Sequence, residues 1–130
     1  AFARAARVVE VELVNQRLVP NYMETRGCVA AYDPASERWT LTAGTQGGHG
    51  IRDTIANAIL HVDPQRIRVV TPDVGGGFGP KAMVYHEYPL VLHAARLTAK
   101  PVRWTCGRVE QFLIDAQRRD NLTTGALAAD

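Results

Sequence analysis

The residues most able to do chemistry lie in a glycine-rich run in the second half of the chain. The run is Gly75-Gly76-Gly77-Phe78-Gly79, and it follows a β-rich segment over residues 67–71. Glycine has no Cβ, so the backbone can adopt positive φ and bring its N–H groups close to a bound anion or electron-rich ligand. The pattern predicts a strand that leads into a ligand-binding turn, or else a tight turn without a ligand.

Two familiar phosphate-binding patterns do not fit this turn. A dinucleotide-binding fingerprint that starts at Gly75 needs Gly or Ala where the chain has Pro80. A P-loop ends in Gly-Lys followed by Ser or Thr, whereas the chain has Pro80-Lys81-Ala82 and so lacks the magnesium-binding hydroxyl. Hydrolysis of a nucleoside triphosphate is therefore disfavoured. A non-catalytic anion- or nucleotide-binding module that uses the Gly75–Gly79 loop stays open as an alternative.

A second loop, residues 44–50, places Gln46 and His49 among glycines. A glutamine amide can donate to an oxo or carbonyl group, and it does not change charge with pH. Loops at the ends of strands are common binding positions. Gln46 is therefore a candidate ligand-contacting residue, and a solvated or capping role is the plain alternative for both side chains.

Cysteine and histidine spacing gives no sign of a metal site. Cys28 and Cys106 are the two cysteines, and neither belongs to a CxxC pair or has partner histidines at zinc spacing. The chain also lacks the HExxH and GxSxG patterns of zinc and serine hydrolases. We expect two buried free thiols in a reducing compartment.

The composition is that of an ordinary globular domain. The chain has 130 residues, a net charge of +2 and 46% hydrophobic residues. It has no apolar run near the ~20 residues that cross a bilayer, and no concentrated basic region of the kind that binds nucleic acid. We predict one soluble cytoplasmic domain over residues 1–130, with no nucleic-acid partner and no membrane span.

The elements that must position the two loops follow from apolar periodicity. Alternation over residues 7–13 predicts a half-buried strand with Val9, Val11 and Leu13 on its inner face. Residues 27–32 and 38–43 flank a turn and predict an antiparallel hairpin. Further strands are predicted over residues 67–71, 102–105 and 121–127.

Helical spacing predicts two main helices. One carries Ile51, Ile55, Ala58 and Ile59 on its apolar stripe, and the other covers about 82–98, with Pro89 either in its first turn or at a kink. A short helix is expected over 108–116. These elements favour an α+β fold: a mixed, mainly antiparallel sheet with the two main helices packed on one face, in two layers.

Taken together, the two loops resemble the molybdenum-binding large subunit of the xanthine dehydrogenase, aldehyde oxidase and carbon monoxide dehydrogenase family. The resemblance rests on Thr45-Gln46, a short helix, the strand ending at Asp73, and Val74–Lys81. It extends over nearly the whole chain, through the segments Asn15–Pro20, Met23–Gly27 and Lys100–Trp104.

The resemblance implies a cofactor site on the two loops. The family's glutamine that matches Gln46 lies beside an oxo ligand of molybdenum, and its Gly-Phe-Gly backbone packs against the pterin and the metal. The cofactor-binding residues implied here are Gln46, Gly76, Gly77, Phe78 and Gly79, with Gln46 and Phe78 near the molybdenum but not ligands of it. The implied cofactor is molybdopterin in its cytosine dinucleotide form with molybdenum, and partner subunits or domains would carry iron–sulfur clusters and FAD.

The same resemblance implies oxidative hydroxylation of an aldehyde, an N-heterocycle or a related small substrate, with water as the oxygen source. Purine-oxidising members have Gly-Gly-Lys-Glu where this chain has Gly79-Pro80-Lys81-Ala82, so xanthine is disfavoured. The family's catalytic glutamate belongs to a motif much further along the polypeptide, and no catalytic residue is expected here. We therefore expect a fragment that is inactive alone, with the rest of the large subunit and the iron–sulfur and flavin subunits as partners.

This interpretation requires the turn with Gln46 and the turn with Phe78 to lie side by side. A folded interaction domain that keeps the scaffold without the cofactor is a third hypothesis.

Overall fold

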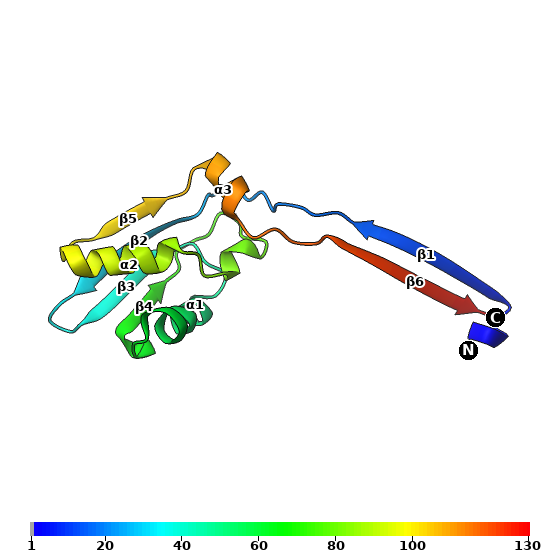
Figure 1. Ribbon diagram of the computed structural model, residues 1–130, viewed down its shortest axis with the longest axis horizontal. Helices are drawn as coiled ribbons and strands as arrows, with labels where there is room; N and C mark the ends of the chain where they lie inside the picture. Colours follow the sequence, from blue (N-terminus) through cyan, green and yellow to red (C-terminus); the bar gives the residue numbers. More distant parts are fainter. Residues whose placement is uncertain (1) are drawn as a thin grey trace. The chain divides into compact units, whose positions relative to one another are not determined.

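The computed structural model describes residues 2–130, which divide into two units (Figure 1). The larger unit is Pro20–Ala116, and the smaller one joins the residues up to Val19 with Gln117–Asp130. All members of the hydrophobic core cluster belong to the larger unit.

The larger unit contains a four-stranded sheet in the order β4-β3-β2-β5. Its strands are β2 (Gly27–Asp33), β3 (Arg38–Ala43), β4 (Ile67–Val70) and β5 (Val102–Thr105). β2 pairs antiparallel with both β3 and β5, whereas β3 and β4 are parallel. Parallel neighbours need a crossover connection, and their carboxyl ends meet at the same edge of the sheet. The loops that follow β3 and β4 therefore leave the sheet side by side.

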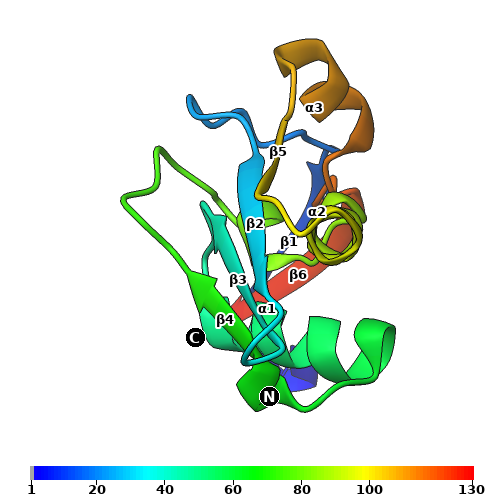
Figure 2. The ribbon, with the colours of Figure 1, turned by 90° about the vertical axis from the view of Figure 1, so that its left-hand side faces the viewer.

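Helices cover one face of this sheet. The crossover from β3 to β4 contains α1 (Gly48–Thr54), a π-helical continuation over Ile55–Leu60 and a 3-10 turn at Pro64–Arg66. The longest helix, α2 (Glu87–Thr98), packs on β2, β3 and β5. Figure 2 shows α1 and α2 on the same side of the strands. The predicted α+β fold with two main helices on one face is confirmed.

The core lies between the helices and alternate residues of the strands. Trp39 and Leu41 of β3 and Ala30 of β2 point to it, since side chains alternate across a strand. They meet Ile51, Ile55 and Ala56 from the first helical segment and Tyr88, Val91, Leu92 and Ala95 from α2.

The apolar stripe of the first helix differs from the predicted one beyond Ile55. Ala56 is buried and Leu60 packs against the core, while Ala58 and Ile59 are exposed. The cause is the π-helical turn, which has more residues per turn than an α-helix and so rotates the later side chains around the axis.

The second main helix begins later than its predicted start near residue 82. Residues Pro80–Ala82 form a 3-10 turn, and α2 starts at Glu87, with Pro89 in its first turn. Proline has no N–H, so a helix continuous from 82 would lack the bond from residue 89 to the carbonyl of Tyr85. In the first turn that N–H is not needed. The short helix predicted over 108–116 is α3 (Arg108–Ile114).

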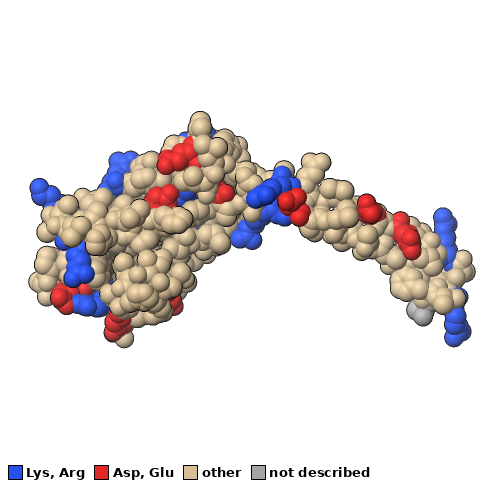
Figure 3. Space-filling view, in the orientation of Figure 1, with Lys and Arg blue, Asp and Glu red and all other residues tan. Residues whose placement is uncertain are grey.

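The smaller unit is a two-stranded ribbon. β1 (Arg7–Asn15) pairs antiparallel with β6 (Asn121–Ala129), and a 3-10 turn at Phe2–Arg4 precedes it. Val9, Val11 and Leu13 are 53%, 49% and 56% exposed, so the prediction of a half-buried strand is wrong. The reason is that only two strands form this sheet, and neither face is covered within the unit. Figure 3 shows mostly uncharged atoms along it.

Candidate functional site

The loops after β3 and β4 are in direct contact. The backbone N–H of Gln46 donates to the carbonyl oxygen of Lys81 at 3.0 Å. The side-chain oxygen Oε1 of Gln46 accepts a hydrogen bond from the N–H of Gly79 at 2.8 Å. At the base of the loops, the hydroxyl oxygens of Thr45 and Thr71 lie 2.6 Å apart. The Gln46 turn and the Phe78 turn therefore lie side by side, as the sequence interpretation requires.

The amide of Gln46 is held in a fixed orientation with its donor end open. Oε1 accepts from Gly79, so the NH2 group must point away from that bond. This NH2 group has no acceptor within residues 2–130, and the residue is exposed. Gln46 can therefore donate to a ligand without changing charge.

The glycine turn combines unusual backbone angles with free N–H groups. Gly76, Phe78 and Gly79 have φ values of 97°, 51° and 106°, and a phenylalanine rarely adopts positive φ. The N–H groups of Gly76, Gly77 and Phe78 find no acceptor in the described part of the chain. Backbone N–H groups are normally hydrogen-bonded, and where no protein acceptor is near, water or a ligand accepts the bond. The Phe78 side chain is 71% exposed beside them.

Gly77 has no room for a side chain beside the Gln46 loop. A Cβ built on Gly77 would lie 2.6 Å from Oε1 of Gln46, so any larger residue would displace the amide. The two loops thus place N–H donors, one amide donor and an exposed aromatic ring next to one another.

An ion pair lies under the glycine turn. The Nζ atom of Lys81 is 2.5 Å from Oε2 of Glu24, and the same oxygen accepts the N–H of Gly75 at 2.9 Å. The Lys81 side chain is fully buried, whereas 45% of the Glu24 side chain is exposed. The hydrogen bond from Lys81 lowers the pKa of Glu24, and the N–H of Gly75 acts in the same direction against partial burial.

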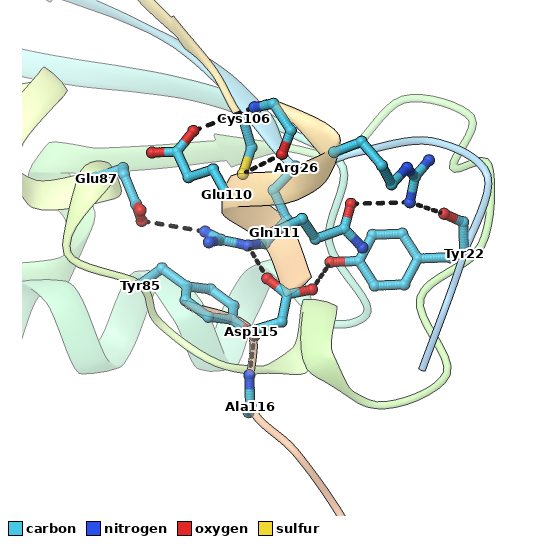
Figure 4. A network of polar contacts seen from close by, with 11 residues as sticks. Tyr22, Arg26, Tyr85, Glu87, Cys106, Glu110, Gln111, Asp115 and Ala116 are labelled. Carbon is cyan, nitrogen blue, oxygen red and sulfur yellow. Dashed lines mark hydrogen bonds and ion pairs between the residues drawn. The ribbon is translucent and has the colours of Figure 1, made fainter. Parts of the chain in front are cut away.

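A second buried cation, Arg26, fixes the segment that carries Glu24 (Figure 4). Its Nε donates to Asp115 at 2.7 Å, and its Nη1 lies 3.1 Å from a carboxylate oxygen of Glu87. The guanidinium carbon lies 3.5 Å from the centre of the Tyr85 ring. The hydroxyl of Tyr22 donates to the other oxygen of Asp115, so residues 22–26 are tied to α3 and α2.

Burial controls the protonation of the groups around Arg26. It raises the pKa of Tyr22, and the hydrogen bond to Asp115 adds to the effect. Cys28 and Cys106 are buried free thiols, as predicted, and burial raises the pKa of each to about 11. Both cysteines are therefore protonated at neutral pH.

The described residues hold no grouping of metal ligands and no helix able to cross a membrane. Among residues 2–130, no three His, Cys, Asp or Glu side chains gather where they could bind an ion. Within the same residues, no helix combines the length and the apolar character that crossing a bilayer requires. A cleft of about 570 Å³ lies beside α1 and β4, lined by Arg38, His49, Arg52 and Arg68 together with neighbouring residues, and the glycine turn is not part of it.

Comparison with known families decides what the paired loops represent. The model of the molybdopterin cofactor-binding domain matches residues 1–130. The chain belongs to this family.

Curated relatives agree with this assignment. This molybdopterin cofactor-binding domain is 35% identical over 128 residues to the carbon monoxide dehydrogenase large chain of Hydrogenophaga pseudoflava, covering 98% of the chain and 16% of that protein. It is also 35% identical over 130 residues to the nicotine 6-hydroxylase large subunit of Paenarthrobacter nicotinovorans, covering 100% of the chain and 16% of that subunit. The domain thus spans about a sixth of the length of these relatives.

Solved structures share the fold. Quinoline 2-oxidoreductase from Pseudomonas putida 86 matches with a TM-score of 0.86 and 36% identity, over 99% of this chain and 16% of that chain. Carbon monoxide dehydrogenase from Oligotropha carboxidovorans matches with a TM-score of 0.84 and 34% identity, over 98% of this chain and 16% of that chain.

The structure brings together all the residues expected at the site, and adds two that the sequence did not single out. Gln46, Gly77, Phe78 and Gly79 meet in one place, and Gly76 precedes them in the same turn. Glu24 and Lys81 lie within longer segments of the family resemblance, and they are 57 residues apart in the chain. The burial of Lys81, which makes a carboxylate partner necessary, is a property of the fold, and no sequence pattern signals it.

Proposed function

We propose that this chain is the part of a molybdenum hydroxylase large subunit that contacts the molybdopterin cofactor. The cofactor-binding residues are Gln46, Gly76, Gly77, Phe78 and Gly79. The observation that carries the proposal is the hydrogen bond from the Gly79 N–H to Gln46 Oε1, which leaves the amide donor of Gln46 beside the unpaired N–H groups of the glycine turn.

The chain's residues fit an electron-rich pterin ligand. The N–H groups of Gly76, Gly77 and Phe78 can donate to it, and the absence of a side chain at Gly77 leaves room for the Gln46 amide beside them. Gln46 donates from its amide and keeps that donor at every pH, so it does not compete for protons. The exposed Phe78 ring offers an apolar surface that excludes water from one side.

When bound, the cofactor supplies oxidative hydroxylation of a small substrate with water as the oxygen source. We assign an aldehyde, an N-heterocycle or a related small molecule as substrate. Two relatives carry names that refer to N-heterocycles, nicotine and quinoline. Ala82 stands where purine-oxidising members have a glutamate, which disfavours xanthine.

The proposal extends to the surroundings of the domain. The cofactor is the cytosine dinucleotide form, the catalytic base lies outside this chain, and the whole chain acts as one cofactor-binding domain of a cytoplasmic enzyme. Its partners are the rest of the large subunit and subunits that hold iron–sulfur clusters and FAD. The alternative of a non-catalytic nucleotide-binding module is not favoured, because the family match extends over residues 1–130.

The test compares two exposed glutamines in the intact subunit produced with its partner subunits. Gln46→Ala is expected to lower molybdenum content, or the rate of dye-linked substrate oxidation per molybdenum, by roughly tenfold or more, because a hydrogen bond to the cofactor is lost. Gln65→Ala, in the 3-10 turn before β4, is the matched control and should leave both unchanged. Wild-type subunit without molybdopterin, or equal values for the two variants, would refute the proposal.

A further inference from the structure

The ion pair under the glycine turn is unusual because its cation is fully buried. The Lys81 side chain has no exposed surface, and Nζ lies 4.7 Å from the centre of the Tyr22 ring. An ammonium group loses its hydration on burial, and this cost is offset only by a well-placed partner. Glu24 is that partner, at 2.5 Å.

Both members of the pair also hold main-chain groups of the two loops. Glu24 accepts the N–H of Gly75 through Oε2, and its own N–H donates to the carbonyl of Gly75 at 3.2 Å. The carbonyl of Lys81 accepts the N–H of Gln46 at 3.0 Å. Glu24 therefore holds the glycine turn at its first residue, Gly75. Lys81, which follows the turn, connects the turn to the Gln46 loop.

The packing around the pair leaves little room for movement. A Cβ on Gly75 would lie 2.6 Å from the Cβ of Glu24, and a Cβ on Gly44 would lie 3.2 Å from its Oε2. Close packing of this kind transmits a shift in one group to its neighbours. A displacement of the Glu24 carboxylate should therefore move Gly75 and change the arrangement of the N–H donors beside Gln46.

We propose that the Glu24–Lys81 ion pair is a positioning device that sets the shape of the glycine turn and the place of Gln46 for cofactor binding. This inference rests on the proposed function. Both residues act through the backbone of Gly75 and Gln46, and neither is assigned a contact with the cofactor. A merely structural pair would lower the stability of the whole unit, whereas a positioning pair acts on the two loops first.

Amide hydrogen exchange of the cofactor-free intact subunit separates these roles. Glu24→Gln keeps the shape and an acceptor but removes the charge. Exchange in peptides covering residues 44–47 and 75–83 should become faster by roughly tenfold or more, because the buried ammonium of Lys81 loses its counter-charge and the Gly75 N–H donates to a neutral amide instead of a carboxylate. Peptides covering α2 should be unchanged. Glu37→Gln, which breaks the exposed pair with Arg66, is the matched control and should change neither region.

A double variant tests whether the two residues act as one device. Glu24→Gln leaves a buried ammonium without its carboxylate, so Glu24→Gln with Lys81→Met should restore part of the lost protection. Retention of molybdopterin by the loaded subunit should follow the same order: wild type, then the double variant, then Glu24→Gln. If the double variant with Lys81→Met does not fold, Glu24→Asp replaces it in the test. Glu24→Asp keeps the negative charge, so its exchange in the two loops should lie between that of wild type and that of Glu24→Gln.

Two results would overturn the positioning role: unchanged exchange in both loops, or an equal increase in the loops and α2. Wild-type subunit that holds no molybdopterin would instead defeat the proposed function, and the exchange data would still report whether the pair shapes the loops.

Discussion

Two buried cations, Arg26 and Lys81, support neighbouring segments in different ways. Arg26 is shared between Asp115 and Glu87 and stacks on Tyr85, and both its side chain and that of Asp115 are fully buried. Lys81 has one carboxylate, Glu24, which is 45% exposed. A guanidinium can satisfy several partners in fixed directions, while an ammonium acts as a point charge. Arg26 thus suits a rigid junction of elements, and Lys81 suits the control of one loop.

The largest expected effect belongs to the Arg26 junction. Asp115→Ala removes one of the two carboxylates and leaves the Tyr22 hydroxyl without its acceptor. Breaking a buried pair in this way costs about 3–5 kcal/mol of the free energy of unfolding. Urea unfolding followed by circular dichroism measures it. Asp53→Ala, which removes the partly exposed pair with Arg52, should stay within about 0.5 kcal/mol of wild type. A loss below about 1 kcal/mol in Asp115→Ala would show that the buried pair does not stabilise the junction.

Glycine substitutions next to the Lys81 pair should have an intermediate effect. Gly75→Ala places the new Cβ 2.6 Å from Cβ of Glu24, so the loop must shift, at about 1–3 kcal/mol of the free energy of unfolding. Gly77→Ala meets the Gln46 side chain from Cγ to Oε1, and because this exposed side chain can turn away, the change should cost less than about 1 kcal/mol while displacing that amide. Unfolding curves give the free energies, and the Gln46 side-chain amide resonances report the displacement. Equal costs for both would contradict the packing described.

Alkaline pH should weaken the Arg26 junction. Burial, followed by Asp115, raises the pKa of Tyr22 above its ordinary 10.0. The protonated form is favoured in the fold, so its stabilisation is complete below pH 10.0 and is lost as the pH rises further. Each such group can contribute up to about 1.4 kcal/mol per pH unit. Tyr22→Phe should flatten the alkaline decline in part, since the pKa values of Tyr85 and Tyr88 are raised too. An unaltered decline would argue against this role of Tyr22.

Low pH should weaken the Glu24–Lys81 ion pair. Of the four changes, this one should have the smallest effect on the free energy of unfolding. Lys81 lowers the pKa of Glu24 from 4.5, so the stabilisation is complete above that value and is lost as the pH falls through the lowered pKa. Hydrogen exchange of the glycine turn should speed up in this acid range in wild type. In the Glu24→Gln variant, hydrogen exchange of the glycine turn over the same pH range should follow only the intrinsic pH dependence of exchange. A persistent acid response in that variant would assign it to another group.

Sequence periodicity predicted the positions of helices and strands better than it predicted which of their faces are buried. The alternation of Val9, Val11 and Leu13 predicted a strand correctly, but alternation alone does not say whether a further layer packs on it. The prediction that the buried stripe of the first helix extends to Ile59 was wrong, because a π-helical turn has no clear sequence signal. The hairpin and β4 were predicted correctly, since each is a short β-rich run bounded by turn residues.

The contact between the Gln46 loop and the glycine turn was predictable from the sequence. The buried ion pairs that hold these segments in place were not. Gln46 and the glycine turn were expected to meet because their motifs occur together in a family resemblance, and the parallel pairing of β3 and β4 explains why they do. The Glu24–Lys81 pair joins positions 57 residues apart, and no local pattern reports such a contact. The same holds for Arg26 and Asp115, which are 89 residues apart.

The β1–β6 ribbon has a consequence for any work with the chain by itself. A two-stranded sheet has unpaired N–H and C=O groups along both outer edges, and these can accept a strand from a second molecule. Glu10 and Glu12, both exposed on β1, oppose such association by charge repulsion. Self-association at high protein concentration should therefore start at the ribbon, and neutralising these two carboxylates should lower the concentration at which it begins.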